Sequence, residues 1–349
     1  MIRIMNCLFI FTLTLAMIHL EIDAADISII AVGDITIGRE LTFTIETKGT
    51  DSLFAGTADL LRDADITVGA LESSISDRGE PEFESEYAFR AVPDVARGLA
   101  HAGFDVLSLA TPHIMDYGAE ALEDTIKLLS QYNISTVGAG SYLQAARKPT
   151  ILTVKNSKVA FLAYYHTSQY GISYADEEHP GPMLASFSLM KQDIAQASEE
   201  SDIVVVFIHW GVIKSKDIIT ERQQFFAHNI IDFGADLVLG QQLHGLKGIE
   251  IYKSKAIVYS LADFIFELYD KQHSKIVLPK FYFQDGKLKR IELTPVWVDN
   301  PNAKYQPQLL HEEAAQKTLE KYQKLCAALN TKMEIEGGKG WIRVEEAYQ

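Results

Sequence analysis

The chain has 349 residues, of which 47% are hydrophobic and 10% aromatic, enough for the core of one large domain or two ordinary ones. Its formal net charge of −15 argues against a nucleic-acid partner, because nucleic-acid binding depends on clustered lysine and arginine. This charge is still compatible with a local basic site.

The N-terminal residues have the pattern of a secretory signal peptide. Arg3 gives a short positive region, Cys7–Ile18 is an apolar run, and small residues around Ala25 offer a cleavage site. We therefore predict that residues 1–25 direct export to the periplasm or the outside of the cell, with an uncleaved membrane anchor as the alternative. Cleavage would leave Cys326 as the single thiol, so the exported chain would have no internal disulfide.

The first half of the chain alternates predicted strands with predicted helices. Strands are expected at Asp26–Val32, Ala64–Leu71 and Phe104–Leu109, and a short one at Ile134–Val137. Helices are expected at Asp51–Arg62, Pro93–Ala102 and Tyr117–Tyr132. In the second half, hairpins interrupt this alternation. They are expected at 150–163, at 249–260 and at 275–295, where Asp285-Gly286 forms the turn.

The segment from Asp202 to Phe266 contains three apolar runs that lead directly into polar residues. The expected strands are Ile203–Ile208, Asp236–Leu239 and Ala256–Leu261, and Thr220 is expected to cap a helix at Glu221–Phe233. Such a mixture of elements is typical of a mixed sheet, or of two packed sheets, flanked by helices. We predict one domain over residues 26–298, followed over residues 299–349 by a linker and a helix at Leu309–Leu329.

The polar residues that follow the predicted strands are all imidazoles or carboxylates. Open α/β folds place their sites at the carboxyl ends of strands, so these side chains are expected to converge. Histidine and carboxylate form the ligand set of divalent metals that activate water for hydrolysis. The candidates are Asp34, Glu72, His113 with Asp116, His209, His244 and Asp263. The simpler readings are a turn residue or cap for Asp34, a cap for Glu72, a mutual hydrogen bond for His113 with Asp116, and a structural histidine for His209 and His244.

Five segments occur in a characteristic order along the chain, from about residue 27 to residue 266. They are IIAVGDITIGR, ITVGALESSIS, VPDVARGLAHAGFDVLSLATPHIMDYG, VFIHWG and FGADLVLGQQLHGLKGIEIYKSKAIVYSLADFIF. Together they resemble the CapA/PgsA-type family of bacterial poly-γ-glutamate capsule synthesis, which is itself similar to calcineurin-like metallophosphoesterases.

The resemblance implies an α/β fold, a metallophosphatase-like four-layer α/β/β/α sandwich with mixed sheets. It also implies a divalent metal (Mn, Zn or Fe), bound as one ion, as more than one, or not at all. The implied metal ligands are Asp34, Glu72, His113, His209 and His244, with Asp263 in the position of a family asparagine. The implied catalytic residues are His113, His209, Asp116 and Arg39, where Arg39 would bind a substrate carboxylate or phosphate.

Several family positions are altered in this chain. Neutral glutamine is a weaker ligand than imidazole, and alanine and isoleucine cannot ligate a metal. The altered positions are Ala70, Thr111, Pro112, Ile213, Gln241, Gln242, Leu243 and Asp263.

The sequence is therefore compatible with two functions. The first is an exported metal-dependent hydrolase acting on an amide or phosphoester of a polymer such as poly-γ-glutamate. The second is a non-catalytic subunit that binds an anionic polymer or a capsule-assembly complex at the membrane. Convergence of Asp34, Glu72, His113, His209 and His244 is expected in either case.

Overall fold

The computed structural model describes residues 27–82, 87–166, 173–210, 219–266, 274–298 and 306–344, with the side chains of residues 39 and 40 also left out. The predicted signal peptide therefore lies outside the described residues. In the part of the chain that is described, none of the helices combines the length and apolar character needed to cross a membrane.

Two mixed sheets form the centre of the molecule. The larger sheet has ten described strands in the order β19-β20-β17-β16-β1-β2-β5-β6, with β15 paired to β1 and β18 to β17. These strands are β1 Ile27–Thr36, β2 Ile66–Leu71, β5 Val106–Ser108, β6 Ser135–Val137, β15 Asp263–Phe266, β16 Lys275–Gln284, β17 Lys287–Trp297, β18 Gln308–Leu309, β19 Glu334–Glu336 and β20 Lys339–Arg343.

The smaller sheet has six described strands in the order β13-β14-β12-β11-β9-β8. They are β8 Thr150–Val154, β9 Ser157–Tyr165, β11 Ile203–His209, β12 Leu237–Gln241, β13 Ile249–Tyr252 and β14 Lys255–Val258. Every residue of β11 is buried, which explains why its sequence IVVVFIH is apolar without alternation. Two-residue strands form two further pairs, β3 Ser74–Ile75 with β4 Arg90–Ala91, and β7 Ala139–Gly140 with β10 Gly181–Pro182.

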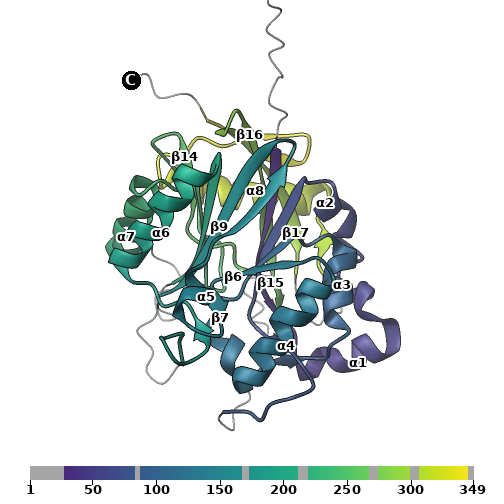
Figure 1. Ribbon diagram of the computed structural model, residues 1–349. Helices are drawn as coiled ribbons and strands as arrows, with labels where there is room; N and C mark the ends of the chain where they lie inside the picture. The colour runs from purple at the N-terminus through teal and green to yellow at the C-terminus, as the bar shows by residue number, and fades with distance from the viewer. Residues whose placement is uncertain are drawn as a thin grey trace, which may run out of the picture.

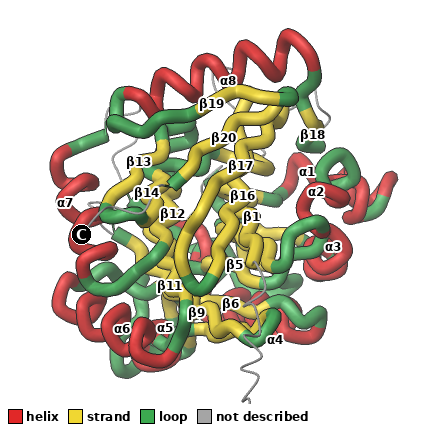
Figure 2. Tube along the Cα trace, turned by 90° about the horizontal axis from the view of Figure 1, so that it is seen from above, coloured by secondary structure: helices red, strands yellow, loops and turns green. Residues whose placement is uncertain are grey.

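The sheets pack face to face, and helices cover their outer faces (Figures 1 and 2). The cluster between the sheets includes Phe161, Val205 and Phe281. The helices on the large-sheet side are α1 Arg39–Lys48, α2 Ala58–Arg62, α3 Val95–Ala102 and α4 Gly118–Gln131, with 3₁₀ turns at Thr50–Leu53 and Pro112–Met115. On the small-sheet side are α5 Leu143–Arg147, α6 Phe187–Glu200 and α7 Glu221–Asp232. The predicted four-layer α/β/β/α arrangement is confirmed.

The C-terminal segment completes the same architecture. Helix α8 (Glu312–Ala327) places Leu319, Tyr322 and Cys326 in the cluster between the sheets. Strands β19 and β20 then extend the large sheet beside β17. The sequence predicted the helix, but it gave no indication of these two strands.

Most local predictions are confirmed. Thr220 caps α7 in a capping box with Gln223. The Asp285-Gly286 turn has φ of 51° and 70°, which matches the two positive angles of a type I′ hairpin turn. The prediction for the first strand was wrong at its end: β1 continues to Thr36, so Asp34 lies inside the strand and is neither a turn residue nor a cap.

Candidate metal centre

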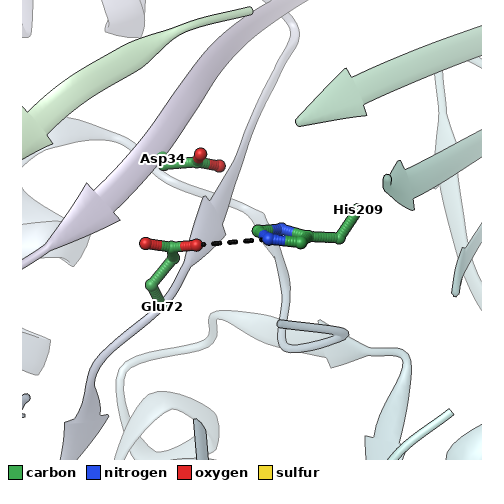
Figure 3. Close-up of side chains that lie close together, drawn as sticks. All are labelled: Asp34, Glu72 and His209. Atoms are coloured by element: carbon green, nitrogen blue, oxygen red, sulfur yellow. Dashed lines mark ion pairs between the residues drawn. The ribbon is translucent and has the colours of Figure 1, made fainter. Parts of the chain in front are cut away.

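Three side chains from both sheets meet between the layers, as Figure 3 shows. Asp34 lies in β1, Glu72 follows β2, and His209 is the last residue of β11. One ligand atom from each residue falls within 4.8 Å of the others, and all three residues are at most 2% exposed. The parallel strands β1 and β2 of one sheet and β11 of the other thus bring their carboxyl ends together, as the sequence predicted.

Asp34 is fixed by its backbone and by one of its carboxylate oxygens. Its amide donates to the carbonyl of Ala262 at 3.0 Å, and its Oδ2 accepts from the amide of Gln242 at 3.2 Å. Its Oδ1 is buried and has no hydrogen-bond partner. Burial, and after it the charges of Glu72 and Asp263, raise the pKa of Asp34 well above its ordinary range.

Gly33 makes this position possible. A Cβ added there would lie 1.7 Å from the carbonyl oxygen of Ala262. Only glycine therefore lets β1 approach the Ala262 backbone closely enough for Asp34 to reach the space between the sheets.

Glu72 is held by Thr36 of the neighbouring strand. The hydroxyl of Thr36 donates to Glu72 Oε2 at 2.8 Å, which leaves Oε1 facing His209. Burial raises the pKa of Glu72, whereas His113 and His244 oppose the increase. Sequence reasoning did not identify Thr36. Its position two residues after Asp34 on the same strand, and therefore on the same face, was the available signal.

His209 is the most unusual member of this group. Its Nε2 lies 3.5 Å from Glu72 Oε1, yet within the described part of the chain neither ring nitrogen has a hydrogen-bond partner. Burial, followed by the positive charges of His244 and His113, lowers the pKa of His209 well below its ordinary value. The imidazole is therefore neutral, and its approach to Glu72 is a contact between a carboxylate and an uncharged ring.

A second group shares Asp34. Ligand atoms of Asp34, His244 and Asp263 also lie within 4.8 Å of one another. In this group His244 Nδ1 donates to Asp263 Oδ1 at 2.8 Å. Burial lowers the pKa of His244, but the charges of Asp263, Glu72 and Asp34 outweigh it and raise the pKa to about 10.

His113 and Asp116 form a pair beside these two groups. His113 Nδ1 donates to Asp116 Oδ2 at 2.9 Å, and the same oxygen accepts from the amide of Phe89. Burial alone would lower the pKa of His113. The hydrogen bond to Asp116 and the charge of Glu72 raise the pKa by more than burial lowers it, so the pKa is raised overall. The hydrogen bond between the two residues, weighed above as the simpler reading, is therefore present. Among the described residues, His113 belongs to neither of the two groups whose ligand atoms lie within 4.8 Å of one another, so its role as a metal ligand stays a prediction.

Two aromatic rings that the sequence did not reveal pack against His113 and His244. The Phe89 ring centroid is 4.9 Å from that of His113, the Phe266 centroid is 5.0 Å from that of His244, and the two phenyl centroids are 6.1 Å apart. Apolar contacts at these positions limit the directions that each imidazole can take.

The remaining predicted positions are only partly described. Arg39 begins α1, but its side chain is not described. Ile213 lies entirely outside the described residues. Ala70 is the register partner of Asp34 in β1 and β2, so the methyl group stands where the family pattern has an amide. Gln241 is the register partner of His209 in β11 and β12.

The unpartnered atoms fit a bound cation. A carboxylate oxygen, a neutral imidazole and a second carboxylate converge in the buried interior, and leaving such atoms unpaired is unfavourable. Imidazole and carboxylate are ordinary ligands of Zn²⁺, Mn²⁺ and Fe²⁺. Asp34, Glu72 and His209 would hold the ion. It would lower the pKa of a water molecule and polarise a substrate oxygen.

Comparison with known proteins identifies a matching family and several similar proteins. Residues 28–268 match the family described as "Bacterial capsule synthesis protein PGA_cap". The PGA biosynthesis protein CapA of Bacillus subtilis is 30% identical over 267 residues, which are 76% of this chain and 70% of that protein. The capsule biosynthesis protein CapA of Bacillus anthracis is 27% identical over 280 residues, 78% of this chain and 68% of that protein. Among solved structures, the NAD nucleotidase NadN of Haemophilus influenzae aligns with 86% of this chain and 56% of its own, with 11% identity and a TM-score of 0.43.

Proposed function

Since this chain belongs to the PGA_cap family of bacterial capsule synthesis proteins, we propose that it is an exported hydrolase of capsule or poly-γ-glutamate metabolism. The bond that it cleaves is an amide or a phosphoester of the polymer or of its carrier. The observation that carries the proposal is the meeting of Asp34, Glu72 and His209 with unpaired ligand atoms in the protein interior.

The residues around this group have the properties that hydrolysis needs. His113 carries its proton on the nitrogen that Asp116 fixes, so its other nitrogen is available for proton transfer to or from a substrate. Asp116 holds the ring by accepting from Nδ1, as a carboxylate does when it orients a catalytic imidazole. Arg39 would bind a carboxylate or phosphate of the substrate.

The proposal is tested by metal analysis and by activity on two substrates. The purified protein is assayed, with Mn²⁺ and after chelation, on poly-γ-glutamate and on a nitrophenyl phosphodiester. We expect metal-dependent cleavage of one substrate, and a loss of at least about 100-fold in Glu72→Gln, in line with the effect of removing one electrostatic stabiliser. Glu120→Gln, whose carboxylate is exposed, is the matched control and should behave like the wild type. Metal-free protein, or equal activity in both variants, would contradict a hydrolase.

A second function is favoured by the altered positions. Ala70 beside Asp34, and Gln241 beside His209, replace residues that the family pattern uses at this site. A protein that keeps the fold but not the reaction would act as a polymer-binding or assembly subunit of a membrane complex. The discriminating result is complementation: Asp34→Ala combined with His209→Ala should abolish polymer production for an enzyme and preserve it for a subunit.

An acidic polymer needs a local positive surface on a chain with a net charge of −15. A cavity of about 390 Å³ over strands β17, β19 and β20 supports such a contact, and its lining includes Arg290, Lys339, Arg343 and Trp341 together with one carboxylate, Glu336. Lys339 pairs with Glu292, and Arg343 approaches Glu334 at 3.8 Å, so the contact depends mainly on Arg290. The Arg290 guanidinium carbon lies 4.4 Å from the Tyr282 ring centroid and 6.0 Å from that of Trp341. Stacking between two rings holds the planar group ready to bind a carboxylate.

Binding of poly-γ-glutamate to Arg290→Glu tests this surface. We expect the affinity to fall at least about tenfold at 50 mM salt, since one cation is replaced by an anion, and the difference to shrink as salt rises. Lys317→Glu on α8, whose side chain is 70% exposed, is the control for a general charge effect. Equal losses of affinity in the two variants would show that this surface is not the binding site for the polymer.

Export is tested on the protein recovered from its native cell. Mass spectrometry of the intact chain should show a mature N-terminus near residue 26 in the periplasmic or extracellular fraction. A chain that retains Met1 in the membrane fraction would instead show an uncleaved anchor.

A further inference from the structure

Two sets of potential ligands share Asp34, and their hydrogen bonding differs. In the set with Glu72 and His209, Asp34 Oδ1 and both nitrogens of His209 are buried without a hydrogen-bond partner. Glu72 Oε2 is used by Thr36, whereas Glu72 Oε1 points to His209 Nε2. Three ligand atoms are therefore free and close together.

The set with His244 and Asp263 is already satisfied. His244 Nδ1 and Asp263 Oδ1 are bonded to each other at 2.8 Å, and Asp34 Oδ2 accepts from the amide of Gln242. Asp263 thus stands behind His244 as a carboxylate that orients an imidazole. What remains is one nitrogen of His244 and Asp263 Oδ2, beside an aspartate that the first set already uses, which are few ligands for a second ion.

Gln241 adds an unpaired group to the first set. It is 0% exposed, and neither its amide oxygen nor its amide nitrogen has a hydrogen bond. Register partners on parallel strands point to the same face, so Gln241 of β12 lies beside His209 of β11 and faces the same space. The Gln241 amide lies close enough to the His209 ring to raise the pKa of His209 as a hydrogen-bond partner would, by less than burial and the charges of His244 and His113 lower it, although the geometry falls short of a hydrogen bond. A buried amide with no partner is unfavourable unless a ligand satisfies it.

We propose that the site holds a single divalent ion, bound by Asp34, Glu72 and His209, with the amide oxygen of Gln241 as the fourth protein ligand. His244 and Asp263 hold no second ion. The set of three oxygens and one nitrogen suits Mn²⁺, because carboxylate and carbonyl oxygens are the ligands that this ion accepts most readily. The inference rests on the proposed metal site and specifies its stoichiometry and one of its ligands.

Stoichiometry is the first test. Chelator-treated protein is loaded with Mn²⁺, freed of unbound metal by gel filtration, and analysed by mass spectrometry for metal content. We expect one equivalent in the wild type, and one equivalent in both Asp263→Asn and His244→Gln. His209→Gln and Glu72→Gln should retain much less.

The role of Gln241 is tested by calorimetric titration with Mn²⁺. Gln241→Met keeps the length of the side chain but lacks the oxygen, so its affinity should fall about tenfold or more, the size of loss seen when a group supporting a metal is removed. Gln241→Glu restores an oxygen and should recover the affinity. Thermal unfolding of the metal-free variants shows whether each is folded, and the Mn²⁺-induced rise in melting temperature gives an independent readout.

The outcomes separate this inference from the proposed function. Two equivalents of Mn²⁺, or loss of the ion in Asp263→Asn, overturn the single-ion site and leave a metal enzyme intact. An unchanged affinity in Gln241→Met overturns the fourth ligand. No bound ion in the wild type overturns the proposed metal enzyme together with this inference.

Discussion

Carboxylates and imidazoles meet in two different ways within a small part of this molecule. In the pairs His113–Asp116 and His244–Asp263, each ring donates a hydrogen bond to its carboxylate, at 2.9 and 2.8 Å. In the group of Asp34, Glu72 and His209, the same residue types lie close together, but both His209 nitrogens and Asp34 Oδ1 have no partner.

In the two pairs, histidine and aspartate satisfy each other's hydrogen bonds, whereas ligand atoms of the group of Asp34, Glu72 and His209 remain unpaired. The pairs are partly exposed at the histidine, and each ring has a partner that favours its charged form. The unpaired group is fully buried, and burial drives Asp34 and His209 toward their neutral forms. The pairs should therefore stabilise the metal-free protein, whereas the unpaired group should destabilise it. Four predictions test this contrast.

The largest effect is expected from Gly33→Ala, because it introduces a clash where the backbones of Gly33 and Ala262 approach closely and hold Asp34 in place. The added methyl group would meet the Ala262 carbonyl at 1.7 Å, and neither backbone can yield without moving β1 away from β15. The free energy of unfolding should fall by at least about 3 kcal/mol, the upper part of the range for overpacked sites. Gly49→Ala, which has φ of 78° but open space around it, should cost only about 1 kcal/mol for its backbone angle. Urea unfolding measures the free energy of unfolding of both variants. Equal losses of stability would mean that the close approach of Gly33 to Ala262 is unimportant.

The next effect concerns the paired groups. Asp116→Ala removes the acceptor of both His113 and the Phe89 amide, so the free energy of unfolding should fall by about 2–3 kcal/mol. Asp59→Ala removes an ion pair with Arg62 in which the aspartate is fully exposed, and it should leave stability nearly unchanged. An Asp116→Ala protein as stable as the wild type would show that the pair does not support the fold.

A smaller change of opposite sign is expected from Asp34→Asn in metal-free protein. The raised pKa of Asp34 means that its contribution to stability is present below the unfolded pKa, about 4, and is lost as the pH rises through the folded pKa. Removing the charge should therefore stabilise the protein by about 1–2 kcal/mol at pH 8 and by much less at pH 4. Thermal unfolding at the two pH values measures this. A variant less stable than the wild type at pH 8 would contradict an uncompensated buried carboxylate.

The smallest effect is the pH dependence due to His209. Its depressed pKa gives a contribution that is present above the unfolded pKa of about 6.5 and is lost as the pH falls toward the folded pKa. In metal-free protein, His209→Gln should gain stability relative to the wild type as the pH falls from 7 to 5, on the order of 1 kcal/mol per pH unit. The difference between the two proteins isolates His209 from other titrating groups. Parallel curves would show that the ring is not buried in its neutral form.

Much of the site could be predicted from where the apolar runs end. Glu72 and His209 follow buried strands directly, and parallel strands bring their carboxyl ends to the same edge. Asp34 was placed correctly near the end of β1, although the strand continues past it. Thr36 and Phe89 were missed because a hydroxyl and a phenyl ring carry no signal for a metal site until their neighbours are known.

The sequence by itself determined the family, the alternation of strands and helices, and which residues could ligate a metal. These follow from apolar periodicity, turn residues and motif order, all of which are local properties of the chain. Only the tertiary structure decided which carboxylates and imidazoles satisfy each other and which do not. That distinction depends on packing between residues far apart in sequence. Thr36 donates a hydrogen bond to one oxygen of Glu72, and Asp263 accepts one from His244, whereas no described residue forms a hydrogen bond with the ring nitrogens of His209. Long-range contacts of this kind also brought β19 and β20 into the large sheet, where their partner strand, and not their own sequence, makes them strands.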